Sequence, residues 1–161
     1  MKLRFAPAWD TGAESSLIAD AHGDLFGTTA LGGANNLGTV FEIAKTAHSY
    51  ASTPTVLVSF NGTDGSAPVG GLIADAHGNL FGTTAEGGAN DAGTVFEIVK
   101  TSHGYASTPI TLVSFNGTNG DHPLGSLIAD AHGDLFGTTT QGGANGQRHG
   151  VRDHRQRLQY S

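Results

Sequence analysis

The sequence predicts an all-β fold built from tandem four-stranded units, like the blades of a β-propeller whose ring is incomplete. Three observations predict it: a 55-residue repeat, short runs of β-forming residues between turn clusters, and 25 glycines among 161 residues. No segment keeps a 3.6-residue apolar period over three turns, so we expect almost no helix.

Comparison of the chain with itself shows the repeat. The segment Leu17–Gly23 recurs at 72–78 and 127–133, and residues 17–71 match residues 72–126 at 41 of 55 positions without a gap. The chain therefore divides into five parts: the end of a truncated repeat (1–16), repeat 1 (17–71), repeat 2 (72–126), a partial repeat 3 (127–145) and a tail (146–161).

Each complete repeat is expected to hold four strands. In repeat 2 they are predicted at 71–75, 80–84, 93–99 and 110–115, separated by a turn at 76–79 and a glycine-rich loop at 86–92. In the third strand Val95 and Glu97 alternate with Phe96 and Ile98, so the two pairs should face opposite sides of the sheet.

Four short strands followed by the longer connection 116–123 are typical of a propeller blade. A ring needs at least about four blades, more than this chain holds. The alternative is a β-solenoid, whose coils of about 20 residues would give a shorter period inside the repeat, and none is found.

The run Gly71–Thr84, followed by Gly87-Gly88-Ala89-Asn90 and Gly93–Ile98, closely resembles the GloVer tandem repeat of bacterial choice-of-anchor proteins. The resemblance covers nearly all of residues 1–145. It implies a bacterial, exported, surface-anchored protein with several repeats and no known catalytic activity. We therefore expect the parent protein to be extracellular or on the cell surface, although residues 1–7 do not form a signal peptide.

The tail 146–161 matches nothing upstream and is rich in Arg, Gln and His. Read one nucleotide later, its codons allow Gly-Thr-Val-Phe-Glu-Ile in register with residues 38–43 and 93–98. We hypothesise a frameshift at or just before Gly146, which the nucleotide sequence tests. The four tail arginines are therefore not interpreted as a nucleic-acid-binding patch.

No cofactor, metal or membrane span is predicted. The chain has no cysteine and no run of 18 apolar residues. His22, His77 and His132 recur in Asp-Ala-His-Gly turns, where we expect the aspartate to bond the local backbone and the glycine to take a positive φ. Histidines on successive repeats are too far apart to share a zinc ion. The turns at 20–24 and 64–65 lack the dense carboxylates of a calcium loop.

Most differences between the repeats fall in predicted loops, which indicates a binding surface carried on a constant scaffold. The candidate binding residues are Glu86, Asp91, Asp121 and His122, and no catalytic residue is assigned. Asp121 and His122 form the only acid–imidazole pairing confined to one repeat.

The sequence thus favours a non-catalytic module, structural or binding an unknown protein or glycan ligand through its loops. Two alternatives stay open: a fragment of a propeller hydrolase whose catalytic residues lie in other blades, and a non-functional gene fragment. Open strand edges predict self-association of the chain.

Overall fold

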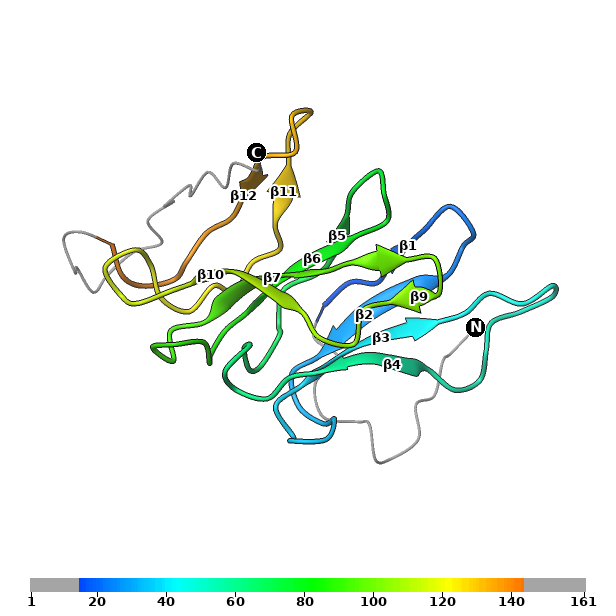
Figure 1. The fold of residues 1–161 in the computed structure, drawn as a ribbon, viewed down its shortest axis with the longest axis horizontal. Helices are drawn as coiled ribbons and strands as arrows, with labels where there is room; N and C mark the ends of the chain where they lie inside the picture. Colours follow the sequence, from blue (N-terminus) through cyan, green and yellow to red (C-terminus); the bar gives the residue numbers. More distant parts are fainter. Residues whose placement is uncertain (1–14, 144–161) are drawn as a thin grey trace.

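The computed structural model describes residues 15–143, in which every regular element is a β-strand. The predicted tail and the hypothesised frameshift, together with most of the truncated repeat at 1–16, lie outside the described residues. The strands form sheets that follow one another in chain order across the molecule, from blue through green to orange (Figure 1).

Repeat 1 forms a four-stranded antiparallel sheet in which the strands lie side by side in chain order. We name it sheet 1; its strands are β1 (Ile18–Ala19), β2 (Leu25–Thr29), β3 (Thr39–Ile43) and β4 (Thr55–Ser59). A bulge in the β3–β4 pairing separates Val40 from Phe41.

Repeat 2 builds the same sheet again, which we name sheet 2. Its strands, in order across the sheet, are β5 (Ile73–Ala74), β6 (Leu80–Thr84), β7 (Thr94–Ile98) and β10 (Ile110–Ser114). Between β7 and β10 the chain makes a separate hairpin of β8 (Lys100–Thr101) and β9 (Gly104–Tyr105). In repeat 1 a bridge between Lys45 and Tyr50 marks the equivalent hairpin.

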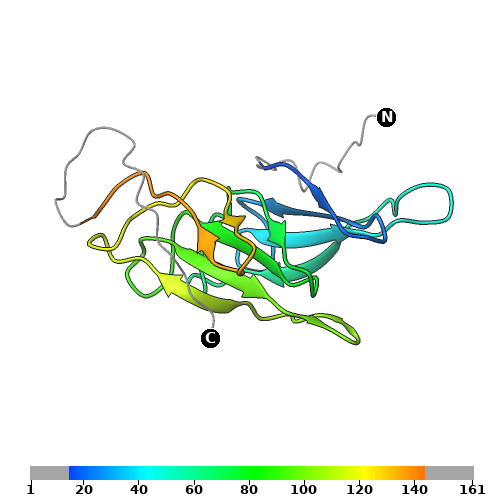
Figure 2. The same cartoon turned by 90° about the horizontal axis from the view of Figure 1, so that it is seen from above.

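In the described part of repeat 3, residues 127–143, the chain forms the first two strands of the pattern, β11 (Ile128–Ala129) and β12 (Leu135–Phe136). In Figure 2 this pair, in yellow and orange, lies against the green strands of sheet 2. The antiparallel order of the sheets differs from the parallel coils of a β-solenoid.

The predicted strands are confirmed, although β7 is two residues shorter and β10 one residue shorter than predicted. Two larger corrections follow. The first strand of repeat 2 is Ile73–Ala74 rather than 71–75, because Leu72 is 2 % exposed and packs into the core between the sheets instead of extending the ladder. The hairpin β8–β9 was not predicted, because its strands of two residues each carry no apolar alternation.

The main core lies between sheet 1 and sheet 2. It joins buried side chains of both repeats, namely Phe26, Val40, Val58, Phe60, Leu72, Leu80, Phe96 and Ile98. The rings of Phe60 and Phe96 meet edge to face, with centroids 5.1 Å apart. A second core repeats this arrangement between sheet 2 and β11–β12, with Phe81, Val95, Phe115, Leu127 and Leu135.

The predicted alternation in β7 explains why one strand serves both cores. Phe96 and Ile98 belong to the first core, whereas Val95 on the opposite face belongs to the second. Gly82 on the neighbouring strand has a packing reason, since a Cβ there would lie 2.7 Å from the ring of Phe96. The sheets therefore stack face to face, and sheet 2, which lies between sheet 1 and β11–β12, contributes buried side chains from both of its faces.

Candidate binding surface at the loop end

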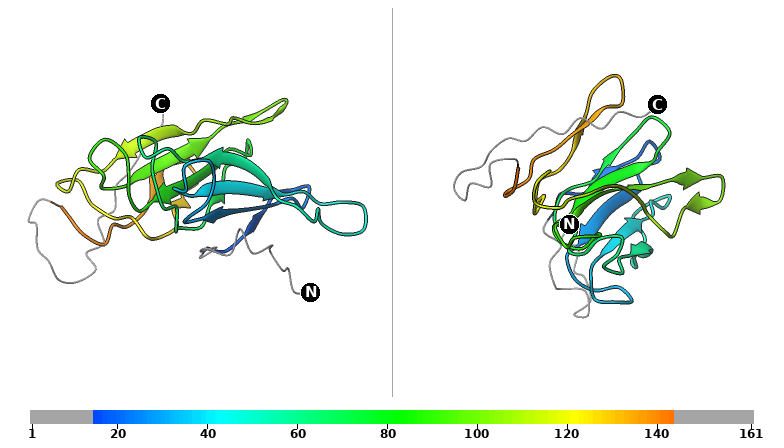
Figure 3. Two further views of the ribbon diagram at one scale, coloured as in Figure 1. Left: turned by 90° about the horizontal axis from the view of Figure 1, so that it is seen from below. Right: turned by 60° about the vertical axis from the view of Figure 1, so that its left-hand side comes forward.

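The antiparallel strand order gives each repeat two distinct ends. The connections between the first and second strands, and between the third and fourth, lie at one end, which we name the turn end. The connections between the second and third strands, and from each sheet to the next, lie at the other end, the loop end. Both hairpins of the turn end, cyan and yellow-green, project to the same side in the left panel of Figure 3.

The glycine-rich loops of the loop end are built alike in both repeats. Asn36 in the first loop and Asp91 in the second have φ of 58° and 56°, a conformation that Asn and Asp tolerate better than most residues. Each side chain accepts a hydrogen bond from a backbone N–H four residues earlier, that of Gly32 (3.0 Å) and Gly87 (2.9 Å) respectively. Asparagine and aspartate are therefore interchangeable in shape here and differ only in charge.

The connections between sheets pair with these loops. Ser66, in the connection from sheet 1 to sheet 2, exchanges two backbone hydrogen bonds with Glu86, of 2.8 and 3.1 Å. Asp121, in the connection to β11, does the same with Gln141 (2.9 and 3.1 Å). Position 66 is therefore paired with position 86, and position 121 with position 141, and all four differ between the repeats.

The structure places all four candidate binding residues at this end. Glu86 and Asp91 are exposed on one loop, while Asp121 and His122 are half-buried in the following connection. The N–H of His122 donates to the carbonyl of Ala92, the residue after Asp91, at 3.1 Å. The backbone therefore brings Asp121 and His122 next to the loop that carries Asp91.

Asp121 and His122 also contact each other. Nδ1 of His122 lies 2.5 Å from Oδ1 of Asp121, and the backbone of His122 has a φ of 53°. The nearby hydroxyl of Thr140 donates to the carbonyl of His122, not to its imidazole. The pair has an acid and a base in contact, but no nucleophile among residues 15–143 is hydrogen-bonded to the ring.

A comparison with known protein families identifies the family of this chain. A model of the Gloeobacter/Verrucomicrobia repeat matches residues 3–151. The chain belongs to the Gloeobacter/Verrucomicrobia repeat family. This confirms the resemblance to the GloVer repeat seen in the sequence. A comparison with curated proteins finds no match.

At the turn end of this family member, the Asp-Ala-His-Gly turn has the predicted geometry. Oδ1 of Asp20 accepts the backbone N–H of His22 (2.9 Å) and of Asp24 (3.0 Å), and Gly23 has a φ of 84°. The same bonds recur around Asp75 and Asp130. These aspartates hold the turns that connect the first two strands of each repeat.

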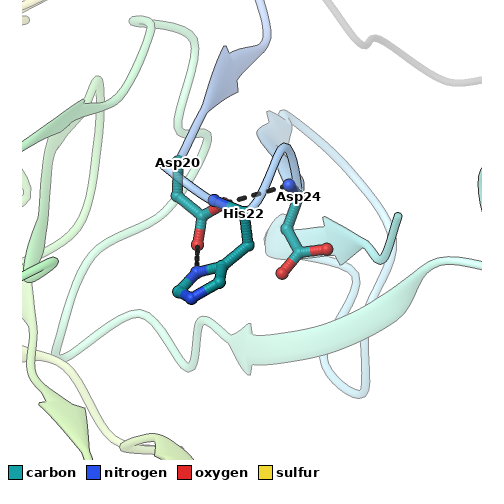
Figure 4. Close-up of side chains that lie close together, drawn as sticks. All are labelled: Asp20, His22 and Asp24. Carbon is teal, nitrogen blue, oxygen red and sulfur yellow. Dashed lines mark hydrogen bonds and ion pairs between the residues drawn. The ribbon is translucent and has the colours of Figure 1, made fainter. Parts of the chain in front are cut away.

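Asp20, His22 and Asp24 bring three possible ligand atoms within 4.8 Å of one another (Figure 4). These groups already have bonds, because Oδ2 of Asp20 meets Nδ1 of His22 at 3.2 Å and Oδ1 of Asp24 accepts the backbone N–H of Lys45 at 2.6 Å. The arrangement is explained by the turn and by its contact with the next repeat.

That contact was not predicted from the sequence. Nζ of Lys100 lies 3.5 Å from Oδ2 of Asp20, and Tyr105 meets Phe26 edge to face with ring centroids 5.3 Å apart. The hydroxyl of Tyr105 donates to the carbonyl of Gly78 at 3.2 Å. The sequence feature that could have indicated this contact is the lysine–tyrosine pair that both repeats keep, at positions 45/50 and 100/105.

The charged groups where repeats 1 and 2 meet at the turn end shift one another's pKa values. Burial raises the pKa of Asp20, but hydrogen bonds from the His22 side chain and from backbone N–H groups, together with the charge of Lys100, outweigh it and leave the pKa lowered. Burial raises the pKa of Glu42, and the charges of Asp24 and Asp20 raise it further. The ammonium of Lys100 therefore lies in an acidic environment that stabilises its charge.

Within residues 15–143 there is no helix of the length and apolarity needed to cross a membrane.

Proposed function

We propose that the chain is a non-catalytic repeat module of a bacterial cell-surface or secreted protein, which binds a protein or glycan ligand through its loop end. The sheets are the blades of a propeller-like stack, and the loops that vary between them carry the recognition. The resemblance to exported, surface-anchored bacterial repeat proteins supports the location.

The propeller arrangement is supported by the strand order and by the packing of the sheets. Each four-stranded antiparallel sheet lies face to face with the next. The connection from each fourth strand runs to the first strand of the following sheet. Closing a ring requires at least about four such sheets, so the proposal includes further repeats in the assembled protein.

A single observation carries the proposed binding role. On two frames with the same loop geometry, positions at the loop end change chemistry from repeat to repeat, while the eight buried side chains of the main core are the same in both repeats. Leu31 becomes Glu86, Asn36 becomes Asp91 and Ser66 becomes Asp121. Residues needed only for folding have no reason to change in this way.

The substitutions also indicate the chemistry of the ligand. Repeat 2 presents the carboxylates of Glu86, Asp91 and Asp121 at positions where repeat 1 has neutral side chains. Carboxylates accept hydrogen bonds strongly from ammonium, guanidinium and hydroxyl groups. The surface of repeat 2 suits a ligand rich in such donors, such as a polyhydroxylated glycan or a basic protein segment.

The repeats supply their own test substitutions. Glu86→Gln, Asp91→Asn and Asp121→Ser each install a residue that another repeat carries at the same position, so the backbone geometry is retained. We expect the triple variant to melt like the parent and to lose about tenfold in affinity for its best ligand on a glycan array or in bacterial surface extracts.

The matched control is His77→Ala at the turn end, whose side chain is 86 % exposed. Ligand binding should be retained in this variant. Unchanged binding by the triple variant, or equal loss in both variants, would refute a binding role for the loop end.

A second candidate function rests on the contact between Asp121 and His122. An acid–imidazole pair at 2.5 Å is the arrangement that orients a general base, as a fragment of a propeller hydrolase would require. We expect no turnover of chromogenic esters or glycosides by the chain. Turnover that disappears in His122→Ala, the residue found at position 67 of repeat 1, would establish the hydrolase instead.

A further inference from the structure

The second strand of repeat 3 lacks the neighbour that its equivalents have. β2 pairs with β3, and β6 with β7, over five positions each. Residues 126–139 are identical to residues 16–29, so β12 and the residues after it carry the same Leu-Phe-Gly-Thr-Thr as β2 and β6. Among the strands of residues 15–143, however, β12 pairs only with β11, and it ends three residues before its equivalents do.

In repeat 2 a phenylalanine of the third strand fills the space beside the second strand. The ring of Phe96 meets that of Phe60 edge to face, and a Cβ on Gly82 would lie 2.7 Å from it. Gly137 is the equivalent glycine in repeat 3. Among residues 15–143, a Cβ there would meet only the side chain of Leu127 within 4 Å, and no aromatic ring.

A cavity lies where that ring would lie. Its walls correspond, 55 positions later, to the residues around Phe96 in the main core; they include Val95, Val113, Phe115, Leu127, Leu135 and Gly137. The cavity measures about 20 Å³, which is room for a water molecule but not for a ring. An incoming strand therefore has to draw residues 137–139 into line with β12 as it pairs, the conformation that residues 82–84 already have in β6.

Thr139 provides a hydrogen-bond acceptor for the same strand. In repeat 2 the hydroxyl of Thr84 donates to the carbonyl of Glu86 at 2.9 Å and accepts the backbone N–H of Thr94 in β7 at 3.1 Å. The hydroxyl of Thr139 makes the first of these bonds, to the carbonyl of Gln141 at 3.0 Å. A third strand beside residues 137–139 would supply the second.

We infer that the edge of β12 opposite β11 binds an extended segment of another polypeptide that carries this repeat, which adds as an antiparallel third strand. The segment has the sequence Thr-Val-Phe-Glu-Ile of β7, with its phenylalanine opposite Gly137 as Phe96 is opposite Gly82. In such strand addition the backbone hydrogen bonds give affinity and the side-chain pocket gives specificity. This inference goes beyond ligand binding at the loop end and does not depend on it.

A folded second copy of the chain is not the expected partner. Its own third strands, β3 and β7, each lie between two neighbouring strands of a sheet and are not available for pairing. The partner is therefore a polypeptide whose third strand is unpaired, such as one that begins at this point of the repeat.

A fluorescently labelled peptide of residues 91–101, added to the full chain, tests the inference by fluorescence anisotropy. We expect saturable one-to-one binding. The same peptide with Phe96→Ala should bind at least about tenfold more weakly, because its side chain no longer fills the cavity. Hydrogen exchange of the complex should show new protection at residues 135–139 and none at the edge strands β4 and β10.

Gly137→Val tests the cavity from the side of the chain. Gly137 does not have a positive φ, and its Cβ would meet only the flexible end of Leu127 among residues 15–143, so the strand can accept valine. The added side chain takes the place of the phenylalanine and should weaken peptide binding at least about tenfold. The control is His132→Ala in the turn between β11 and β12, where the side chain is 85 % exposed; it should bind like the parent.

Absence of peptide binding would overturn the inference. So would equal affinity of the two peptides, protection at β4 or β10 instead of residues 135–139, or protection of residues 135–139 that rises with the concentration of the chain alone, which would make a second copy the occupant. Should Gly137→Val fail to fold, the comparison of the two peptides still decides. The triple variant at the loop end should bind the peptide like the parent, so failure of loop-end binding and failure of strand addition give different results.

Discussion

The side chain of Lys100 joins two repeats at a single point, and its surroundings make that junction sensitive to alkali. Burial lowers the pKa of Lys100, but Tyr105 and Asp20 outweigh burial and leave the pKa raised. Burial raises the pKa of Tyr105. A group whose pKa is higher in the folded state stabilises the fold below its unfolded pKa and loses that contribution as the pH rises through the folded value. Both groups therefore weaken the junction above a pH of about 10.

We expect the double variant Lys100→Met, Tyr105→Phe to melt at a temperature that depends less on pH than the parent's between roughly pH 9.5 and 11.5. Circular dichroism melts across this range measure it. His103→Ala, at the tip of the same hairpin, should keep the parent's dependence. If the melting temperatures of the double variant and the parent fell equally as the pH rose, this junction would not titrate as described.

Asp91 gives a second prediction at the residue scale. Asp91→Asn keeps the acceptor for the N–H of Gly87 and suits the positive φ, so the free energy of unfolding should change by less than about 0.5 kcal/mol. Asp91→Ala removes the acceptor for the N–H of Gly87, so no side-chain hydrogen bond then stabilises the positive φ at this position. It should destabilise by about 1–2 kcal/mol in urea unfolding. Equal stability of the two variants would contradict the assigned bond.

At the scale of elements, the sequence could predict the strands but not the contacts that shape them. Strands β6, β7 and β10 were predictable because their alternating or continuous β-forming residues are bounded by glycine and asparagine turns. The burial of Leu72 depends on the neighbouring repeat, which no local pattern reports. The β8–β9 hairpin has strands of two residues each, too short for an alternating pattern. The loop-end candidates were predictable because they differ between repeats, whereas the Lys–Tyr contact requires the geometry of two repeats together.

The stacking of the sheets should depend most on the aromatic contact between Phe60 and Phe96. Phe96 is fully buried, so Phe96→Ala should lower the free energy of unfolding by about 3–5 kcal/mol. Val56→Ala, at a position 40 % exposed on β4, is the control and should cost less than about 1 kcal/mol. Urea unfolding measures both. Similar costs for the two substitutions would indicate that the sheets do not depend on this contact.

At the scale of the whole molecule, a constant scaffold carries two kinds of surface. The turn end repeats the same aspartate turns and Lys–Tyr hairpins, and it joins one repeat to the next. The loop end keeps its backbone geometry but changes its exposed side chains. The separation explains how a repeat of high internal identity can still present different chemistry in each copy, provided that the sheets hold fixed positions relative to one another.

The most direct test of this account is therefore the distance between equivalent points of the two repeats. The chain has no cysteine, so the exposed residues His22 and His77 can be changed to cysteine and spin-labelled without background. Double electron–electron resonance on the dilute chain should give one narrow distance distribution, which broadens when Phe96→Ala and Lys100→Met are added. A broad distribution in the parent would show that the repeats move independently and would contradict the rigid face-to-face stack.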